Sequence, residues 1–185
     1  MSKLRLAAVA ACTMDPARDP VAKIDGGVSP ARGDNGVLEM QVWADSGLQY
    51  WRTVVATDYA ISDFRMTVKL PAGPAYTTWI LEKTHPWFAV DEYDNRFPAT
   101  AVPWNHPLGP DEVTVSGTDG SYTVTLDGNT LPKNGRFVLT FWRPFVDTEL
   151  TATAKITGAF TDKKACASGQ HGGNGSNGSL AWPFS

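Results

Sequence analysis

The chain has little cysteine and no long apolar run. Only two cysteines, Cys12 and Cys166, occur among 185 residues, so at most one intramolecular disulfide can form. No apolar stretch approaches the length of a membrane-spanning helix. A chain of this length instead fits one domain, which buries a sizeable core without metals or many disulfides.

Positive charge and catalytic motifs are also scarce. The net charge of −3 and the isoelectric point near 5.5 argue against general nucleic-acid binding, which needs a basic face to displace counterions from phosphates. A local basic groove is still compatible with these values. The chain has no Gly-x-Ser-x-Gly elbow and no phosphate-cradling loop, so the sequence indicates no nucleophilic hydrolase and no catalytic residues.

Apolar and polar side chains alternate along many short segments, whereas no long stretch has helical periodicity. The alternation is clearest in Val37–Trp43, Phe64–Leu70 and Glu149–Ile156. A period of two is typical of half-buried antiparallel strands, so the sequence predicts an all-β fold. The predicted strands cover residues 37–44, 51–57, 61–70, 77–83, 87–91, 112–117, 121–126, 136–142 and 149–160.

Two dipeptides predict tight turns between these strands. Asp119-Gly120 separates two alternating runs, and a two-residue Asp-Gly loop twists in the same sense as the strands that it joins. It is the strongest hairpin signal in the chain. Asn134-Gly135 predicts the next turn.

Composition divides the chain into an arm, a body and a tail. Residues 13–36 are rich in Asp, Pro, Gly and Arg, which suits an arm and a turn rather than a central strand. We expect an N-terminal arm or first strand over 1–21 and a sandwich over 22–166. The last segment, 167–185, is rich in Gly, Ser and Asn, and should form a flexible tail.

The two cysteines allow three states. A bond between Cys12 and Cys166 would close 154 residues, which removes roughly 5 kcal/mol of denatured-state entropy and requires an oxidising compartment. The cysteines could instead be two unpaired thiols. In the third state Cys12 is lipidated, because Lys3 and Arg5 precede an apolar run whose end, Val9–Cys12, resembles a bacterial lipoprotein box.

The order of several turn and strand motifs resembles the Ig-like repeats of bacterial surface proteins. The resemblance covers roughly residues 22–160 and rests on Lys23–Gly26, Pro30, Gly33-Asp34, Val68–Gly73, Leu131–Phe141 and Leu150–Ile156. It implies an Ig-like antiparallel β-sandwich of seven to nine strands, secreted or on the cell surface, without a catalytic role. An aromatic and proline-rich insertion at 84–110 departs from the family pattern, so its function is not inherited.

This insertion contains the candidate ligand site: His85, Trp87, Phe88, Trp104 and His106. Flat aromatic faces stack on sugars or porphyrin-like rings, and imidazoles ligate metals, so converging loops would form a binding surface. Alternatively, the tryptophans cover an open end of the sandwich and the histidines are solvated. No cofactor is expected, although haem or another porphyrin would suit these side chains. The acidic run Asp91–Asn95 lacks the glycine and spacing of an EF-hand, which favours a solvated loop.

Three functions are compatible with these features. The leading hypothesis is an adhesin-like, non-catalytic binding module that contacts host matrix, a glycan or a small aromatic ligand, with no nucleic acid partner and no membrane span. The second is a radical scavenger, because the chain is similar in general form to the secreted antioxidant of skin actinobacteria. The third is a virion decoration or assembly protein.

Overall fold

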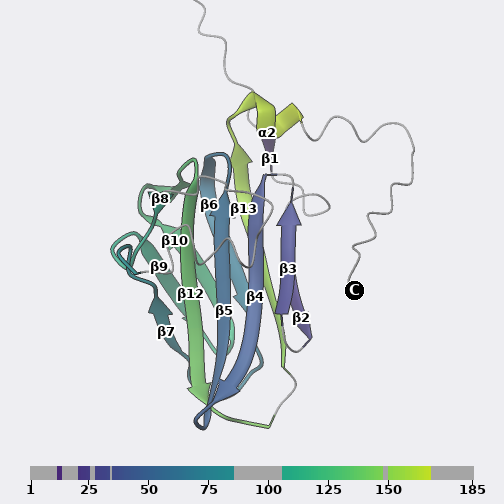
Figure 1. Cartoon of the computed structure of the whole chain (residues 1–185), viewed down its shortest axis with the longest axis vertical. Coiled ribbons are helices and arrows are strands. Elements are labelled where there is room, and N and C mark those ends of the chain that lie inside the picture. Colours follow the sequence, from purple (N-terminus) through teal and green to yellow (C-terminus); the bar gives the residue numbers. More distant parts are fainter. Residues whose placement is uncertain are drawn as a thin grey trace, which may run out of the picture.

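The computed structural model describes residues 12–13, 21–25, 28–33, 35–85, 106–147 and 150–167. These residues form two β-sheets that pack face to face, with one short helix at the upper end (Figure 1). The predicted all-β sandwich is therefore confirmed. In Figure 1 the second sheet lies in front of the first.

The first sheet, sheet A, has seven strands. From one edge to the other, the strand order is β1, β13, β6, β10 and β9. In addition, β2 pairs with β13, and β11 pairs with β6. The strands are β1 (Cys12–Thr13), β2 (Val21–Asp25), β6 (Ile61–Lys69), β9 (Val113–Thr118), β10 (Ser121–Leu126), β11 (Thr130–Leu131) and β13 (Thr151–Phe160).

The second sheet, sheet B, has six strands in the order β3, β4, β5, β12 and then β7 with β8, both of which pair with β12. The strands are β3 (Val28–Gly33), β4 (Gly36–Asp45), β5 (Leu48–Thr57), β7 (Thr77–Ile80), β8 (His106–Pro107) and β12 (Gly135–Pro144). A 3₁₀ turn, η2 (Asp127–Asn129), follows β10, and the helix α2 (Lys163–Ala167) follows β13.

The core lies between the sheets, because alternate side chains of each strand point inward. Phe64 of β6, from sheet A, meets Phe137 of β12, from sheet B, with ring centroids 6.0 Å apart and planes at 84°. This edge-to-face contact is a favoured aromatic geometry. The other core side chains that are less than 2% exposed are Leu38, Met40, Trp51, Val55, Met66, Val68, Val124, Leu131, Leu139, Phe141 and Ala154.

Most of the predicted strands are present, since β4, β5, β6, β7, β9, β10, β12 and β13 overlap the predicted ranges. The predicted strand at 87–91 lies outside the described residues. The Asp119-Gly120 hairpin is confirmed: Thr118 pairs with Ser121, and φ is +53° at Asp119 and +78° at Gly120. Two positive φ values are typical of the turn that best matches strand twist.

The predicted turn at Asn134-Gly135 is confirmed, with φ at +57° at Asn134. The strands on either side, β11 and β12, belong to different sheets. The turn therefore links the two layers and makes no hairpin. In addition, the segment 13–36 contains β2 and β3, which form edge strands by pairing with β13 and β4. The absence of a central strand there agrees with the prediction.

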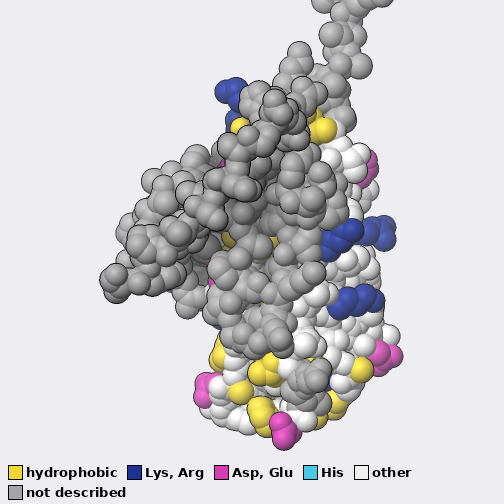
Figure 2. Space-filling model, turned by 90° about the vertical axis from the view of Figure 1, so that its right-hand side faces the viewer, with side chains coloured by type: hydrophobic (Ala, Val, Ile, Leu, Met, Phe, Trp, Pro, Cys, Tyr) yellow, Lys and Arg dark blue, Asp and Glu magenta, His cyan; other side chains and the backbone are white. Residues whose placement is uncertain are grey.

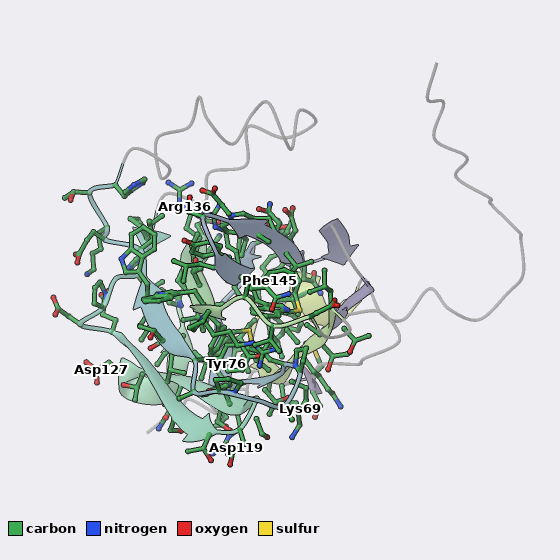
Figure 3. All side chains as sticks on the ribbon, turned by 90° about the horizontal axis from the view of Figure 1, so that it is seen from below. Lys69, Tyr76, Asp119, Asp127, Arg136 and Phe145 are labelled. Carbon is green, nitrogen blue, oxygen red and sulfur yellow. A yellow bond between two sulfur atoms is a disulfide. The ribbon has the colours of Figure 1, made fainter. Side chains whose placement is uncertain are left out.

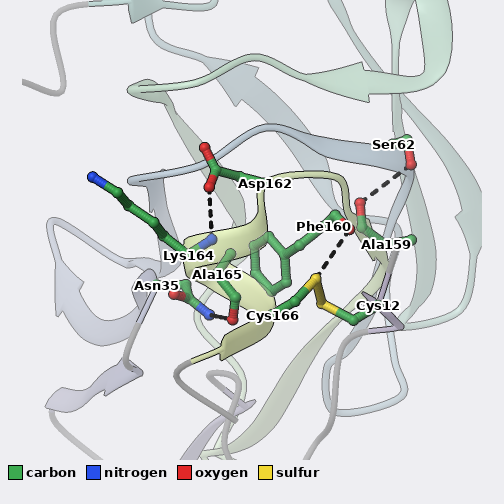
Figure 4. The surroundings of a disulfide bond; sticks show 9 residues. All are labelled: Cys12, Asn35, Ser62, Ala159, Phe160, Asp162, Lys164, Ala165 and Cys166. Atoms are coloured by element: carbon green, nitrogen blue, oxygen red, sulfur yellow. Dashed lines mark hydrogen bonds between the residues drawn. A yellow bond between two sulfur atoms is a disulfide. The ribbon is translucent and has the colours of Figure 1, made fainter. Parts of the chain in front are cut away.

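A disulfide between Cys12 and Cys166 ties β1 to α2 at the upper end of the sandwich (Figure 4). Their Cα atoms are 5.6 Å apart, although the residues are 154 positions apart in sequence. The Asp162 carboxylate accepts a hydrogen bond from the Lys164 N–H at 2.8 Å, which caps the helix start. The predicted disulfide is thus present, in place of the two alternative states.

The opposite end of the sandwich is closed by Arg143, whose side chain is fully buried. Its guanidinium carbon lies 4.7 Å from the ring centroid of Tyr76 and 5.2 Å from that of Trp51, and Nη1 donates to the carbonyls of Pro71 and Ala72 at 3.3 Å. Figure 3 views the molecule from this end, with Tyr76 labelled. Desolvation by burial raises the pKa of Tyr76 to about 12, although the Arg143 charge opposes the shift.

Candidate functional site

Two separate short strands, β7 and β8, pair with the same edge of β12. Antiparallel β7 pairs Trp79 with Thr140, and parallel β8 pairs His106 with Gly135. Two further backbone hydrogen bonds extend these pairings: the Leu81 N–H donates to the Val138 carbonyl at 3.0 Å, and the Leu108 N–H donates to the Arg136 carbonyl at 2.8 Å. The two ends of the 84–110 insertion are therefore held by neighbouring positions of one strand.

Trp79 is the exposed aromatic ring at this edge. It is 47% exposed, and the other large exposed hydrophobic side chain among the described residues is Phe145, at 52%. His85 lies beside it, with ring centroids 6.4 Å apart and planes at 80°. The His85 N–H donates to the Glu82 carbonyl at 3.0 Å, which turns the chain back toward Trp79.

An ion pair joins the segment that follows β7 to the segment that follows β8. Lys83 Nζ lies 2.6 Å from Glu112 Oε1, and the Gly109 N–H donates to Glu112 Oε2 at 2.9 Å. Gly109 permits this approach, because a Cβ there would lie 2.9 Å from Lys83 Cγ. Desolvation acts to raise the pKa of Glu112, but the two hydrogen bonds and the charges of Lys83 and His106 outweigh it and lower the pKa below its usual value.

The rest of the outer face of sheet B is less accessible. Val54, Leu81 and Val138 form a small apolar cluster on this face, and each is at most 5% exposed. Further along, Trp43 stacks on Tyr50 with centroids 5.0 Å apart and planes at 8°, and the Arg52 guanidinium lies 4.6 Å from the Trp43 centroid. Because Trp43 and Tyr50 stack face to face and are only half-buried, whereas Trp79 is exposed and touches His85 edge-on, Trp79 is the ring best placed to accept a ligand.

The structure describes two of the five predicted site residues. His85 and His106 lie at the two ends of the insertion, on the same edge of sheet B. Trp87, Phe88 and Trp104 lie outside the described residues, as does the acidic run Asp91–Asn95.

Trp79 was missed by reasoning from sequence. Its position in the alternating run Thr77–Ile80 is the signal that could have identified it, since Ile80 faces the core and adjacent strand residues face opposite ways. What the sequence does not indicate is that this ring stays uncovered.

The described residues contain no group of three or more His, Cys, Asp or Glu side chains that could hold a metal ion. None of the helices in the described ranges has the length and apolar character needed to cross a bilayer. Comparisons with protein-family models, with curated proteins and with solved structures found no match for the chain.

The chemistry of this edge suits binding of a flat ligand. An exposed indole offers an apolar face and one N–H donor, and the neighbouring imidazole adds a polar group that donates or accepts hydrogen bonds. Both side chains are attached to a paired strand or to the turn directly after it. The sheet therefore fixes the positions from which they contact a ligand.

Proposed function

We propose that the chain is a non-catalytic binding module that works outside the cell and contacts its ligand at the β7–β8 edge of sheet B. The observation that carries the proposal is the anchoring of both ends of the 84–110 insertion on β12, directly beside exposed Trp79. Loops presented by a rigid sheet are the usual place for recognition in sandwich proteins.

The extracellular location is supported by the Cys12–Cys166 bond, because disulfides persist mainly in oxidising compartments. The sandwich also agrees with the resemblance to Ig-like repeats of bacterial surface proteins, which stays a prediction. The exposed indole favours a glycan or a small aromatic ligand, either free or displayed on a host matrix component.

The test is binding to an array of immobilised glycans and to surface-coated fibronectin. We expect Trp79→Ala to weaken binding to the recognised surface by about ten-fold, because loss of one stacked ring removes about 1 to 3 kcal/mol. Phe145→Ala is the matched control, since it removes a similarly exposed aromatic ring beyond the end of β12, where the Phe145 N–H donates to the Gly47 carbonyl. Equal losses in the two variants, or none in Trp79→Ala, would contradict the assignment.

Haemin is the probe that separates the scavenger hypothesis from the adhesin-like one. If the ligand is a tetrapyrrole, a titration produces a shifted Soret band that weakens in His85→Ala, because imidazole is a common axial ligand of haem iron. A Soret band that does not depend on His85 or Trp79 would argue against this edge as the binding site.

A further inference from the structure

The outer face of sheet A is covered with hydroxyl groups. It is accessible, because the outward side chains of its strands are exposed or half-buried, whereas alternate residues of the same strands fill the core. The outward hydroxyl residues of β6, β9, β10 and β13 are Thr67, Thr114, Ser116, Thr118, Ser121, Thr123, Thr125, Thr151, Thr153 and Thr157.

Among the side chains that the structure describes on β6, β9, β10 and β13, three exposed cations lie between these hydroxyls: Arg65 and Lys69 on β6, and Lys155 on β13. Lys155 pairs with Thr67, the residue midway between the other two along β6. Lys155 is therefore a diagonal neighbour of both Arg65 and Lys69, about 7 to 8 Å from each at the backbone, whereas Arg65 and Lys69 are four residues, or roughly 13 Å, apart along β6. Because like charges repel, an anionic ligand would relieve the repulsion between Lys155 and each of these two neighbours.

Acidic side chains lie at the margins of this face. Asp63 is at the start of β6, and Asp119 is in the β9–β10 turn. Figure 2 shows Lys and Arg side chains at mid-height along the side that carries sheet A, with acidic side chains above and below. Within the described part of the chain, no ion pair joins any of the three cations to a carboxylate.

We propose that this face, defined by Arg65, Lys69, Lys155 and the surrounding Thr and Ser residues, binds a linear anionic polysaccharide. The cations match sulfate or carboxylate groups, and the hydroxyls supply donors and acceptors for the hydroxyls and ring oxygens of sugars. A face that extends across the neighbouring strands β13, β6, β10 and β9 offers these groups to an extended chain. This surface is separate from the β7–β8 edge, which belongs to the other sheet.

Charge and side-chain type select this partner over other macromolecules. Protein interfaces concentrate energy in buried aromatic anchors, and single-stranded nucleic acids need rings on which bases stack. Among the described side chains on this face there is no aromatic ring. A chain with a net charge of −3 also lacks the long-range attraction that duplex DNA requires.

The test is binding of the full chain to heparin, measured by calorimetry or by retention at several salt concentrations. With three cations engaged, counterion release predicts a slope of log affinity against log salt of about −2 to −3. This slope corresponds to roughly a 16- to 64-fold loss between 50 and 200 mM salt. Lys69→Thr/Lys155→Thr should reduce the slope to about −1 and weaken binding at 50 mM salt by about ten-fold. Threonine keeps the strand propensity at both positions.

The matched control is Lys133→Thr/Lys164→Thr, which makes the same change in net charge at two exposed lysines outside this face. It should retain near wild-type heparin binding. Equal losses in the two double variants, no heparin binding at 50 mM salt, or tighter binding to single-stranded or duplex DNA than to heparin would overturn the proposal. Trp79→Ala should leave heparin binding unchanged, so the two surfaces are tested separately.

Discussion

At the scale of single residues, Arg143 stands out as a charged side chain that is fully buried. A buried guanidinium is costly unless its charge and its donors find partners. Here the rings of Trp51 and Tyr76 and the carbonyls of Pro71 and Ala72 surround it. The segment that crosses between the sheets is therefore held by Arg143 together with Tyr76, whose hydroxyl donates to the Pro71 carbonyl at 2.7 Å.

Gly73 is the residue that permits this arrangement. Its φ is +149°, and a Cβ added there would lie 2.6 Å from Arg143 Nη1. We predict that Gly73→Ala lowers the free energy of unfolding by about 2 to 4 kcal/mol, because backbone strain and displacement of a buried cation add together. Urea unfolding followed by fluorescence measures the change.

Gly47→Ala is the control for backbone strain alone. Gly47 has φ at +76°, but no atom lies within 4 Å of its added Cβ. We expect a loss of only about 1 to 2 kcal/mol there. If the two variants lose equal stability, the contact between Gly73 and Arg143 contributes nothing.

At the scale of elements, the Lys83–Glu112 pair links the segment after β7 to the segment before β9. The pKa of Glu112 is lowered in the folded protein, so the stabilisation is present above the unfolded pKa of about 4.3 and is lost as pH falls through the folded value. We predict that the Gly109 amide resonance, which reports its hydrogen bond to Glu112, titrates with a midpoint below 4.3.

Lys83→Met tests the cause of this shift. It removes both a hydrogen bond and a positive charge while keeping the aliphatic stem, so the midpoint should rise. Lys133→Met removes a lysine that does not contact Glu112 and should leave the midpoint in place. A midpoint that is the same in all three proteins would show that Lys83 does not set the Glu112 pKa.

Much of the strand pattern was predictable from sequence, because it depends on local alternation. The Asp119-Gly120 hairpin is also local, since its turn dipeptide determines the pairing of its neighbours. The strands β2 and β3 were missed because their pairing with β13 and β4 comes from distant segments. The Asn134 turn was recognised, but the sheet to which each flanking strand belongs depends on tertiary packing.

The candidate site was less predictable than the fold. The histidines and prolines mark 84–110 as unusual, but sequence does not reveal that Leu81 and Leu108 bond to neighbouring parts of β12. The exposure of Trp79 likewise depends on which faces of sheet B are covered, and that is decided by contacts between segments far apart in sequence.

At the scale of the whole molecule, the two sheets have different outer faces. Sheet B has buried apolar and stacked aromatic side chains on its outer face, with an exposed ring at one edge. Sheet A has a hydroxyl-rich face with three cations. In Figure 3, Lys69 and Asp119 lie on the opposite side of the molecule from Arg136, which is on β12 of sheet B. The two proposed binding surfaces can therefore act at the same time.

The disulfide acts on the stability of the whole sandwich. We predict that Cys12→Ser/Cys166→Ser lowers the free energy of unfolding by up to about 5 kcal/mol, because the denatured chain regains the freedom of a 154-residue loop. Reduction of the wild-type protein should give the same loss in urea unfolding, and the double variant should not respond to reductant. Equal stability of oxidised and reduced protein would contradict the prediction.

The same bond also determines how the domain responds to tension. Cys12 and Cys166 lie close together, with Cα atoms 5.6 Å apart, and nearly all of the sandwich lies between them in sequence. A pull applied through segments on either side of this pair passes directly from one sulfur to the other. The strands then bear no load, so the domain would keep both surfaces folded under mechanical stress until the covalent bond is cleaved.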